Sequence, residues 1–369
     1  MTLAAAAQDE AIAWLRLTLT PDVHEAEQRA LLKAFGSPGA ALAASVDSRA
    51  GVVKKSAARA LATGAPDEAI ERALRWLAEP NHHLVTVGEP DFPAALHTIP
   101  DPPNVLYVIG RLELLNTPGF AIVGSRNATS LGMRDAEAFA QALSQAGLTI
   151  VSGLALGIDT AAHRGGLAAR GSSVAVMATG ADGIYPARNM DLARKLSSQG
   201  ALVTEFPLGS APIPDHFKQR NRLISGLARG VLVVEAAHKS GSLITAHCAV
   251  DQGRDVFAIP GSIHAPLSKG CHRLIKEGAK LVEGAEDILA ELGIANDAPS
   301  KERRKRLDAP TRAFLEAMGY APVSIDAIAA QAGGSAAEVA ARLAQLEIEG
   351  VVAGLPGGLF QRLGERVIE

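Results

Sequence analysis

The sequence contains few of the residues that build disulfide-rich or metal-bound domains. Of 369 residues only Cys248 and Cys271 are cysteines, and neither has a second ligand at metal-binding spacing. A disulfide framework and a structural zinc site are therefore not expected. No window approaches the roughly 20 apolar residues of a membrane span, and the Ala-rich start lacks a basic secretory signal. We expect a soluble, cytoplasmic protein with no metal, no cofactor and no membrane partner.

Aromatic residues and excess charge are also scarce. Only 4% of residues are aromatic, so an aromatic side chain beside a cluster of cations is a candidate ligand contact. The formal net charge of −3 argues against a surface coated in positive charge for duplex DNA, but it leaves room for one local basic groove. What is abundant is apolar residues (48%) and glycine (36 residues), which is typical of a packed α/β core joined by tight turns.

Differences in sequence pattern divide the chain. Residues 1–85 have a helical pattern, and helices at 26–35 and 40–44 around a Gly/Pro turn suggest a SAM-like or helix-hairpin-helix-like module, or a plain packing module. Residues 86–293 alternate strand and helix signals, which predicts an extended Rossmann-like, doubly wound and mostly parallel sheet. The clearest helix is expected at 134–146, and strands are expected at 120–123, 149–151, 173–178, 202–205, 231–234 and 256–259.

The C-terminal part predicts a charged linker and a small domain. Residues 294–309 contain a run of basic residues between prolines, which is typical of an exposed connector. Residues 310–369 follow the order helix, helix, helix and hairpin, which is the order of a winged-helix-like domain. Its third helix carries Glu338, Glu347 and Glu349 against Arg342, so we favour a protein contact over a grip on duplex phosphates.

The first strand of the central domain is followed by Gly124, Ser125 and Arg126. A dinucleotide-binding fold would place G-x-G-x-x-G here and an acidic residue after the second strand, and both are missing. A nicotinamide-dependent oxidoreductase is therefore not expected. Arg126 can instead pair with a phosphate in a bidentate manner. The alternative is an arginine that holds a neighbouring loop through a salt bridge.

The second strand leads into a Gly-rich turn before a helix, where backbone amides can face a phosphate. We interpret Asp159 as the cap of that helix. His163, four residues later, is either a general base or a histidine whose hydrogen bonds are satisfied inside the fold, and we favour the second.

Two further segments add polar and cationic groups. Lys239 precedes Ser240, Gly241, Ser242 and Thr245, an arrangement typical of a phosphate-binding turn that opens a helix. The P-loop spacing G-x-x-x-x-G-K-[ST] and the nucleophile elbow G-x-S-x-G are both absent. The other segment contains Phe217, Lys218, Arg220 and Asn221. Its phenylalanine either stacks on a base in the crevice or plugs the core, and the convergence of several such loops favours the first.

At this point the sequence resembles the DprA/Smf family of DNA-processing proteins. The resemblance rests on seven motifs in family order: Gly124-Ser125-Arg126, Ser152-Gly153-x-Ala155-x-Gly157-Ile158-Asp159, Glu205-Phe206-Pro207-Leu208-Gly209, Arg220-Asn221-Arg222-x-Ile224, Val234-Glu235-Ala236, Ser240-Gly241-Ser242-Leu243-x-Thr245-Ala246 and Pro260-Gly261. It implies sequence-independent binding of single-stranded DNA, dimerisation through the Rossmann-like domain, and loading of the RecA recombinase in natural transformation.

The resemblance also implies roles for individual residues. Arg126 would contact a phosphate, Phe217 would hold a base, and Lys218, Arg220 and Lys239 would line the groove. Close backbone or hydroxyl contacts would come from Gly124, Ser125, Ser240, Gly241 and Ser242, and the helix opening near Thr245 would give its amides to a phosphate. The chain departs from the family at Leu154, where glycine is frequent, and at Cys271-His272, where many members have asparagine.

We therefore expect a binding protein without enzymatic activity. Two alternatives stay open at this point: a nucleotide N-glycosidase-like hydrolase that uses Glu235, and a sensor that binds a small nucleotide.

Overall fold

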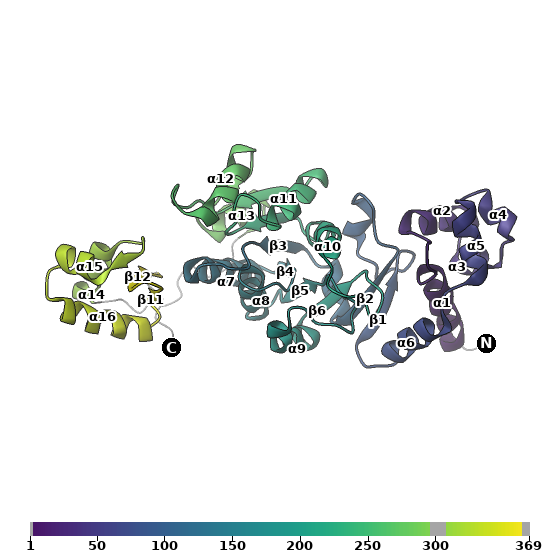
Figure 1. The fold of residues 1–369 in the computed structure, drawn as a ribbon, viewed down its shortest axis with the longest axis horizontal. Coiled ribbons are helices and arrows are strands. Elements are labelled where there is room, and N and C mark those ends of the chain that lie inside the picture. Colours follow the sequence, from purple (N-terminus) through teal and green to yellow (C-terminus); the bar gives the residue numbers. More distant parts are fainter. Residues whose placement is uncertain (1–2, 296–307, 364–369) are drawn as a thin grey trace. The chain divides into compact units, whose positions relative to one another are not determined.

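The structure is a computed structural model that describes residues 3–295 and 308–363. Within these residues, 3–128 and 135–295 form one compact unit, and 129–134 with 308–363 form a second (Figure 1). The basic run at 301–306, which the sequence assigns to a linker, lies outside the described residues.

The first compact unit begins with six helices, and their turns follow the sequence signals. After α2 the chain turns at Gly36, whose φ of +82° favours glycine, and its N–H donates to the Leu32 carbonyl over 2.8 Å. The next helix starts behind Ser37, whose hydroxyl accepts from the Ala40 N–H. The helical pair expected at 26–35 and 40–44 is thus present. The helices are α1 (Leu3–Thr18), α2 (Glu25–Phe35), α3 (Pro38–Ala43), α4 (Val46–Ala50), α5 (Lys55–Thr63) and α6 (Asp67–Leu77).

A nine-stranded sheet forms the centre of this unit, in the order β1-β2-β6-β5-β4-β3-β7-β8-β9. Strands β3 to β9 run parallel, and β1 and β2 add an antiparallel edge next to β6. The strands are β1 (His82–Thr86), β2 (Val105–Gly110), β3 (Gly119–Val123), β4 (Thr149–Ser152), β5 (Ser173–Val176), β6 (Ala201–Thr204), β7 (Gly230–Val233), β8 (Asp255–Ala258) and β9 (Lys280–Leu281).

Helices cover both faces of the sheet, as a doubly wound fold requires. Phe120 and Ile122 of β3 pack with α7, α8 and α13, whereas their neighbours Ala121 and Val123 pack with α10, α11 and α12 on the other face. The helices are α7 (Ser130–Gln145), α8 (Ile158–Leu167), α9 (Met190–Gln199), α10 (Pro214–Gly226), α11 (Ser242–Asp251), α12 (Lys269–Lys276) and α13 (Ala285–Glu291). Short 3₁₀ segments are η1 (Ala94–Thr98), η2 (Leu112–Asn116), η3 (Ala187–Asn189) and η4 (Pro266–Ser268).

The strand order changes direction at β3. The chain runs outward from β3 through β4, β5 and β6, and then returns to place β7 on the other side of β3. Loops after β3 and β7 therefore diverge and leave a crevice at the carboxyl ends of these strands, which is where open α/β sheets bind ligands.

The second compact unit has the winged-helix order. It contains α14 (Ala309–Met318), β10 (Val323–Ser324), α15 (Ile325–Ala332), α16 (Ala336–Ile348), β11 (Val352–Leu355) and β12 (Leu359–Arg362). Its strands pair in the order β10-β12-β11 around a core that includes Phe314, Ile328 and Leu343. Helix α16 starts at a capping box between Ser335 and Glu338.

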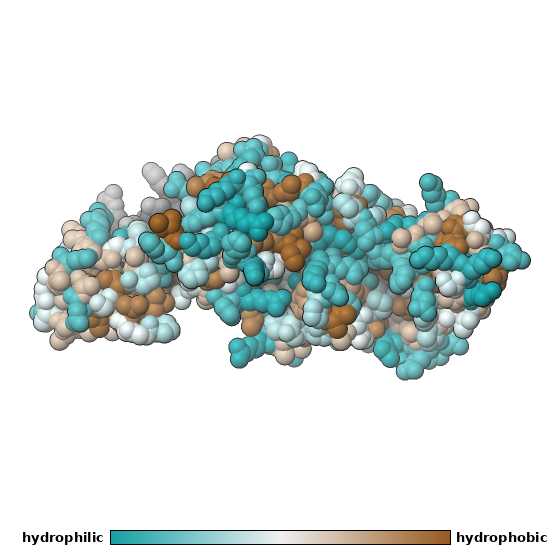
Figure 2. Space-filling model, turned by 45° about the horizontal axis from the view of Figure 1, so that its top comes forward, coloured by the Kyte–Doolittle hydropathy of each residue, from teal (hydrophilic) through white to brown (hydrophobic). Residues whose placement is uncertain are grey.

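In the view of Figure 2 apolar atoms form separate patches among hydrophilic ones. Among the described residues, no helix has the length and apolar character to span a bilayer.

Candidate nucleic-acid interface

A cavity of about 710 Å³ opens at the carboxyl ends of β3 and β7. Its walls come from the loop after β3, the start of α8, the helix α10 and the loop that leads into α11. Every one of the twelve predicted site residues lines it: Gly124, Ser125, Arg126, Phe217, Lys218, Arg220, Asn221, Lys239, Ser240, Gly241, Ser242 and Thr245. Segments far apart in the sequence therefore meet where the sequence analysis placed a ligand.

Helix α10 presents one face to this cavity. Phe217, Arg220, Asn221 and Ile224 follow the i, i+3, i+4, i+7 spacing that places side chains on one side of a helix. The helix spans Pro214–Gly226 and places these side chains together.

Two aromatic rings and a cation meet at the mouth of the cavity. The guanidinium carbon of Arg126 lies 5.1 Å from the Phe217 ring centroid. Tyr185 meets the same phenylalanine edge to face, with 5.8 Å between the ring centroids. Arg126 is exposed, and Tyr185 is 47% exposed, so both are accessible to a ligand. Phe217 is only partly buried and lines the cavity, so the alternative in which its ring plugs the core is wrong.

Arg220 has the place that the resemblance implies, in the lining of the groove, but it is buried there. It lines the cavity, but the residue is only 4% exposed, and its Nη1 donates to the carbonyls of Gly153 (2.6 Å) and Val176. Burial lowers its pKa to about 10, against the opposing effect of Asp159. A Cβ at Gly153 would lie 2.3 Å from Nη1, so the glycine makes room for the guanidinium. Arg220 therefore fixes the floor of the cavity.

Asp159 also differs from its expected role as a helix cap. The cap position of α8 is Gly157, whose φ is +76° and which has no space for a Cβ beside the Ser125 carbonyl. The Asp159 carboxylate instead accepts from the N–H groups of Gly153 (3.1 Å) and Ala155 (3.3 Å), in the loop before the helix. Burial raises its pKa, and Arg220 acts to lower it. Asp159 therefore holds the loop that precedes α8 at the floor of the cavity.

His163 is a structural residue, as the sequence analysis favoured. It is fully buried, its Nδ1 lies 2.8 Å from the Ser173 hydroxyl, and its Nε2 accepts from the Leu154 N–H over 3.2 Å. Leu154 has a φ of +61°, a left-handed conformation that glycine adopts at lower cost. The carbonyl of Leu154 accepts from Asn189 over 2.8 Å. His163 and Asn189 thus hold a leucine at the position where glycine is frequent in the family.

The buried histidine predicts an acid-sensitive stability. Burial lowers the pKa of His163 to about 3, below its value in the unfolded chain, so the unfolded state binds the proton first. Stability from this residue is present above pH 6.5 and is lost as the pH falls toward 3. Between pH 7 and pH 5 the loss is expected to be about 2 kcal/mol, at 1.36 kcal/mol per pKa unit. Urea unfolding at both pH values measures it, and in His163→Gln the difference should shrink by that amount; an unchanged difference would contradict this assignment.

The start of α11 supplies the polar side of the cavity. The helix begins at Ser242, whose hydroxyl lies 2.7 Å from that of Ser240, and Lys239 is exposed just before it. Thr245 is 1% exposed, so its side chain belongs to the wall and the amides of the first turn lie nearer the opening. Lys218 is exposed but forms a 2.9 Å ion pair with Asp215, which reduces its net charge toward a ligand.

In the described part of the chain, no group of three or more His, Cys, Asp or Glu side chains is placed to hold a metal ion. Glu235, the residue that a hydrolase would use, follows β7 but is not among the residues that line the cavity.

Comparison with known proteins identifies the family. The family model for DNA recombination-mediator protein A matches residues 83–293, and the DprA winged helix domain matches residues 298–358. The chain belongs to the DprA/Smf family. The Smf protein of Escherichia coli K12 is 43% identical over 302 residues, which cover 79% of this chain and 81% of that protein. DprA of Streptococcus pneumoniae R6 is 48% identical over 200 residues, covering 54% and 71%.

Solved DprA structures share the fold. The crystal structure of S. pneumoniae DprA has a TM-score of 0.68 at 36% identity and covers 76% of this chain and 97% of that one. DprA from Helicobacter pylori, whose structure is described in terms of its single-stranded DNA binding mode, has a TM-score of 0.52 at 29% identity and covers 57% and 95%.

Several cavity residues lie outside the predicted set for this DprA/Smf chain, among them Tyr185 and Asn127. Tyr185 lies outside the seven motifs, although the scarcity of aromatic residues was a usable signal for it. Asn127 also lines the cavity and follows Arg126 directly.

Proposed function

We propose that this protein binds single-stranded DNA without sequence preference in the cavity at the end of β3 and β7, and that it does so without catalysis. The observation that carries the proposal is the exposed Arg126 beside the Phe217–Tyr185 pair. Unpaired bases have π faces that stack on such rings, whereas the bases of a duplex are occupied with one another. The single-stranded DNA binding mode for which the H. pylori DprA structure is described supports the same ligand for this chain.

The polar groups of the cavity are suited to contact the DNA backbone. Arg126 and Lys239 are exposed cations that can neutralise phosphates, and Lys218 adds a third cation once Asp215 releases it. Ser240, Gly241 and Ser242 bring hydroxyl and amide donors of the α11 start to the same cavity. None of these contacts distinguishes one base from another, so the binding is expected to be independent of sequence.

We also propose that the protein loads a RecA recombinase onto incoming DNA and acts as a homodimer through its Rossmann-like domain. Membership of a family described as recombination mediators supports the first part. We further propose that residues 1–85, 86–293 and 310–369 act as separate functional modules.

The winged-helix domain is proposed to contact protein in preference to duplex DNA. Arg342 of α16 donates to the Thr311 hydroxyl over 3.3 Å, and its guanidinium carbon lies 4.8 Å from the Phe314 ring centroid. This cation of the expected recognition helix is thus used within its own domain, and Glu338 and Glu347 on the same helix would repel phosphate.

Salt-dependent binding tests the proposed DNA site. Fluorescence anisotropy of a labelled single-stranded oligonucleotide should show binding that weakens with salt, with a log–log slope near −2 if Arg126, Lys218 and Lys239 each neutralise about one phosphate, at roughly −0.7 per phosphate. Unlabelled single strands should compete far better than duplex of the same sequence. Equal competition by duplex, or no binding by the folded protein at low salt, would contradict the proposal. Calorimetric titration with a mononucleotide tests the alternative of a nucleotide sensor. A sensor would bind one nucleotide tightly, whereas a protein that binds single strands should bind it weakly.

A further inference from the structure

A second cavity, of about 250 Å³, lies against the other side of α10 within the same compact unit. Whereas Phe217 and Arg220 face the proposed DNA site, His216 and Gln219 of the same helix line this second cavity. Its remaining walls come from α2, the start of β2 and the segment after β6. Nothing proposed above for DNA binding uses these walls.

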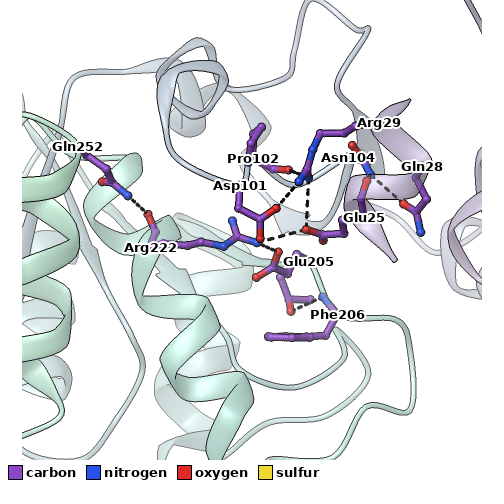
Figure 3. Close-up of polar contacts among 11 residues, drawn as sticks. Glu25, Gln28, Arg29, Asp101, Pro102, Asn104, Glu205, Phe206, Arg222 and Gln252 are labelled. Atoms are coloured by element: carbon purple, nitrogen blue, oxygen red, sulfur yellow. Dashed lines mark hydrogen bonds and ion pairs between the residues drawn. The ribbon is translucent and has the colours of Figure 1, made fainter. Parts of the chain in front are cut away.

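A cluster of charged groups with excess negative charge borders this cavity (Figure 3). The Nη2 of Arg222 contacts the carboxylates of both Glu205 and Glu25, the latter at 3.5 Å. Arg29 pairs with Asp101 and lies 3.7 Å from Glu25. Three carboxylates thus face two guanidinium groups, which leaves one negative charge when all are ionised.

Burial makes that excess charge costly. The Glu205 side chain is 1% exposed, and burial raises its pKa to about 8, against the opposing effect of Arg222. Burial also raises the pKa of Glu25, and the nearby Glu25 carboxylate further raises the pKa of Glu205. At neutral pH a proton therefore balances the cluster. A buried charge requires a counter-charge, and a bound cation can take the place of that proton.

Hydrogen-bond acceptors at the cavity lack partners within the described structure. They are Oε1 of Glu205, Oδ1 of Asn104 and the hydroxyl of Tyr107, and each is buried. The residues themselves are 6%, 2% and 1% exposed. Buried polar atoms are almost always hydrogen-bonded, so these oxygens call for a ligand or water that donates hydrogen.

We propose that this second cavity binds a small organic cation of the guanidinium or ammonium class, with its N–H groups directed to Glu205, Asn104 and Tyr107. Such a head group supplies both the positive charge and several donors. Val23, Val105 and Phe206 give the cavity an apolar wall for an alkyl chain, and the exposed His24, Pro207 and Gln219 mark its entrance. A free amine and the side chain of a protein share this chemistry.

Binding of the cation is linked to loss of the Glu205 proton. Only the ionised cluster offers the unbalanced charge, so the apparent dissociation constant rises as the competent fraction falls. With the Glu205 pKa near 8, binding is expected to be about tenfold weaker at pH 7 than at pH 9, from the ionised fraction at each pH. A guanidinium stays protonated throughout this range.

Titration calorimetry with butylguanidinium at pH 7 and pH 9 tests the proposal. The expected result is saturable binding that strengthens with pH and releases a proton, whereas butylurea, a neutral analogue of similar shape, should not bind. Glu205→Gln removes the excess charge and should abolish both the binding and its pH dependence. No binding at either pH, as when only water and a proton occupy the cluster, would overturn the proposal. Equal binding of butylurea, or unchanged binding by folded Glu205→Gln, would do the same.

Further variants and a second ligand sharpen the result. Tyr107→Phe removes one unpartnered hydroxyl and should weaken binding without loss of fold, because no protein group bonds that hydroxyl. Arg126→Ala, in the proposed DNA site, should leave butylguanidinium binding unchanged, so failure of one proposal is distinguishable from failure of the other.

N-acetylarginine amide carries the same group on a peptide unit. Its binding would indicate a protein side chain as the source, and binding of butylguanidinium alone a free metabolite; binding of neither overturns the proposal.

The titratable groups around Glu205 are distinguishable in this design. Glu25, Arg29, Asp101 and Arg222 form its charged surroundings, and His24, His216 and Tyr107 line the cavity. If any of these, and not Glu205, controlled the pH dependence, the binding that remained in Glu205→Gln would keep it.

Discussion

Replacing Arg220 by methionine is expected to lower the free energy of unfolding by about 3–5 kcal/mol, the usual cost of removing one partner from a buried charge arrangement. Asp159 would remain buried without the cation that favours its ionised form. The carbonyls of Gly153 and Val176 would also lose their shared donor. Urea-induced unfolding of the full chain, followed by far-UV circular dichroism, measures the change in the unit that contains the sheet.

The double variant separates charge from shape. Arg220→Met combined with Asp159→Asn removes both buried charges and should recover part of the loss, since the amide no longer needs a cation nearby. Lys218→Met on the same helix is the matched control. Its ion pair with Asp215 is exposed to solvent, so its loss should change the free energy of unfolding little. If Arg220→Met were as mild as Lys218→Met, the floor of the cavity would not depend on this guanidinium.

Six of the seven parallel strands, β3 to β8, could be predicted because each is a short β-branched run bounded by turn residues. The expected strand at 231–234 is β7 at Gly230–Val233, and the one at 256–259 is β8 at Asp255–Ala258. The one at 173–178 ends two residues early, at Val176. Strands β1, β2 and β9 were missed. Strand β9 is only two residues long, and β1 and β2 pair antiparallel at the sheet edge, outside the strand–helix alternation that guided the prediction.

The location of the site could be predicted for a general reason. Loops after the strands of a doubly wound sheet meet at the point where strand order reverses, so residues after β3 and β7 had to be neighbours. Sequence could not reveal which cations are buried. Arg220 and Arg126 look equivalent in the sequence, yet the helical register turns the first onto the carbonyls under the cavity and leaves the second exposed.

The second cavity could not be predicted, because its partners come from distant segments. Glu205 and Arg222 were recognised only as parts of family motifs, and Glu25 lies on a helix of the N-terminal part. No short-range sequence pattern connects residues that lie this far apart in the chain. The contact of α2 with the segment before β2, where the Asn104 amide donates to the Glu25 carbonyl, brings their charges together (Figure 3).

Truncating Phe217 to alanine is expected to weaken single-strand binding by about 1–3 kcal/mol, the usual contribution of one base stacked on an aromatic ring. At about 1.4 kcal/mol per tenfold, the dissociation constant should rise between 5-fold and 150-fold. Because Phe217 is only partly buried, the fold should survive. The salt slope should change little, since no cation is removed.

Arg126→Ala should give the complementary result. Affinity should fall for every oligonucleotide sequence, and the salt slope should become shallower by about 0.7, the amount for one phosphate on a single strand. Arg194→Ala is the matched control, because that arginine is exposed on α9, pairs with Asp191 at 3.1 Å and lies outside the residues that line the cavity. If Arg126→Ala kept the wild-type slope, or if Arg194→Ala reduced it equally, the phosphate contact would lie elsewhere on the protein. If Arg126→Ala reduces the salt slope and Phe217→Ala does not, Arg126 contacts a phosphate and Phe217 contacts a base, as their places at the mouth of the cavity suggest.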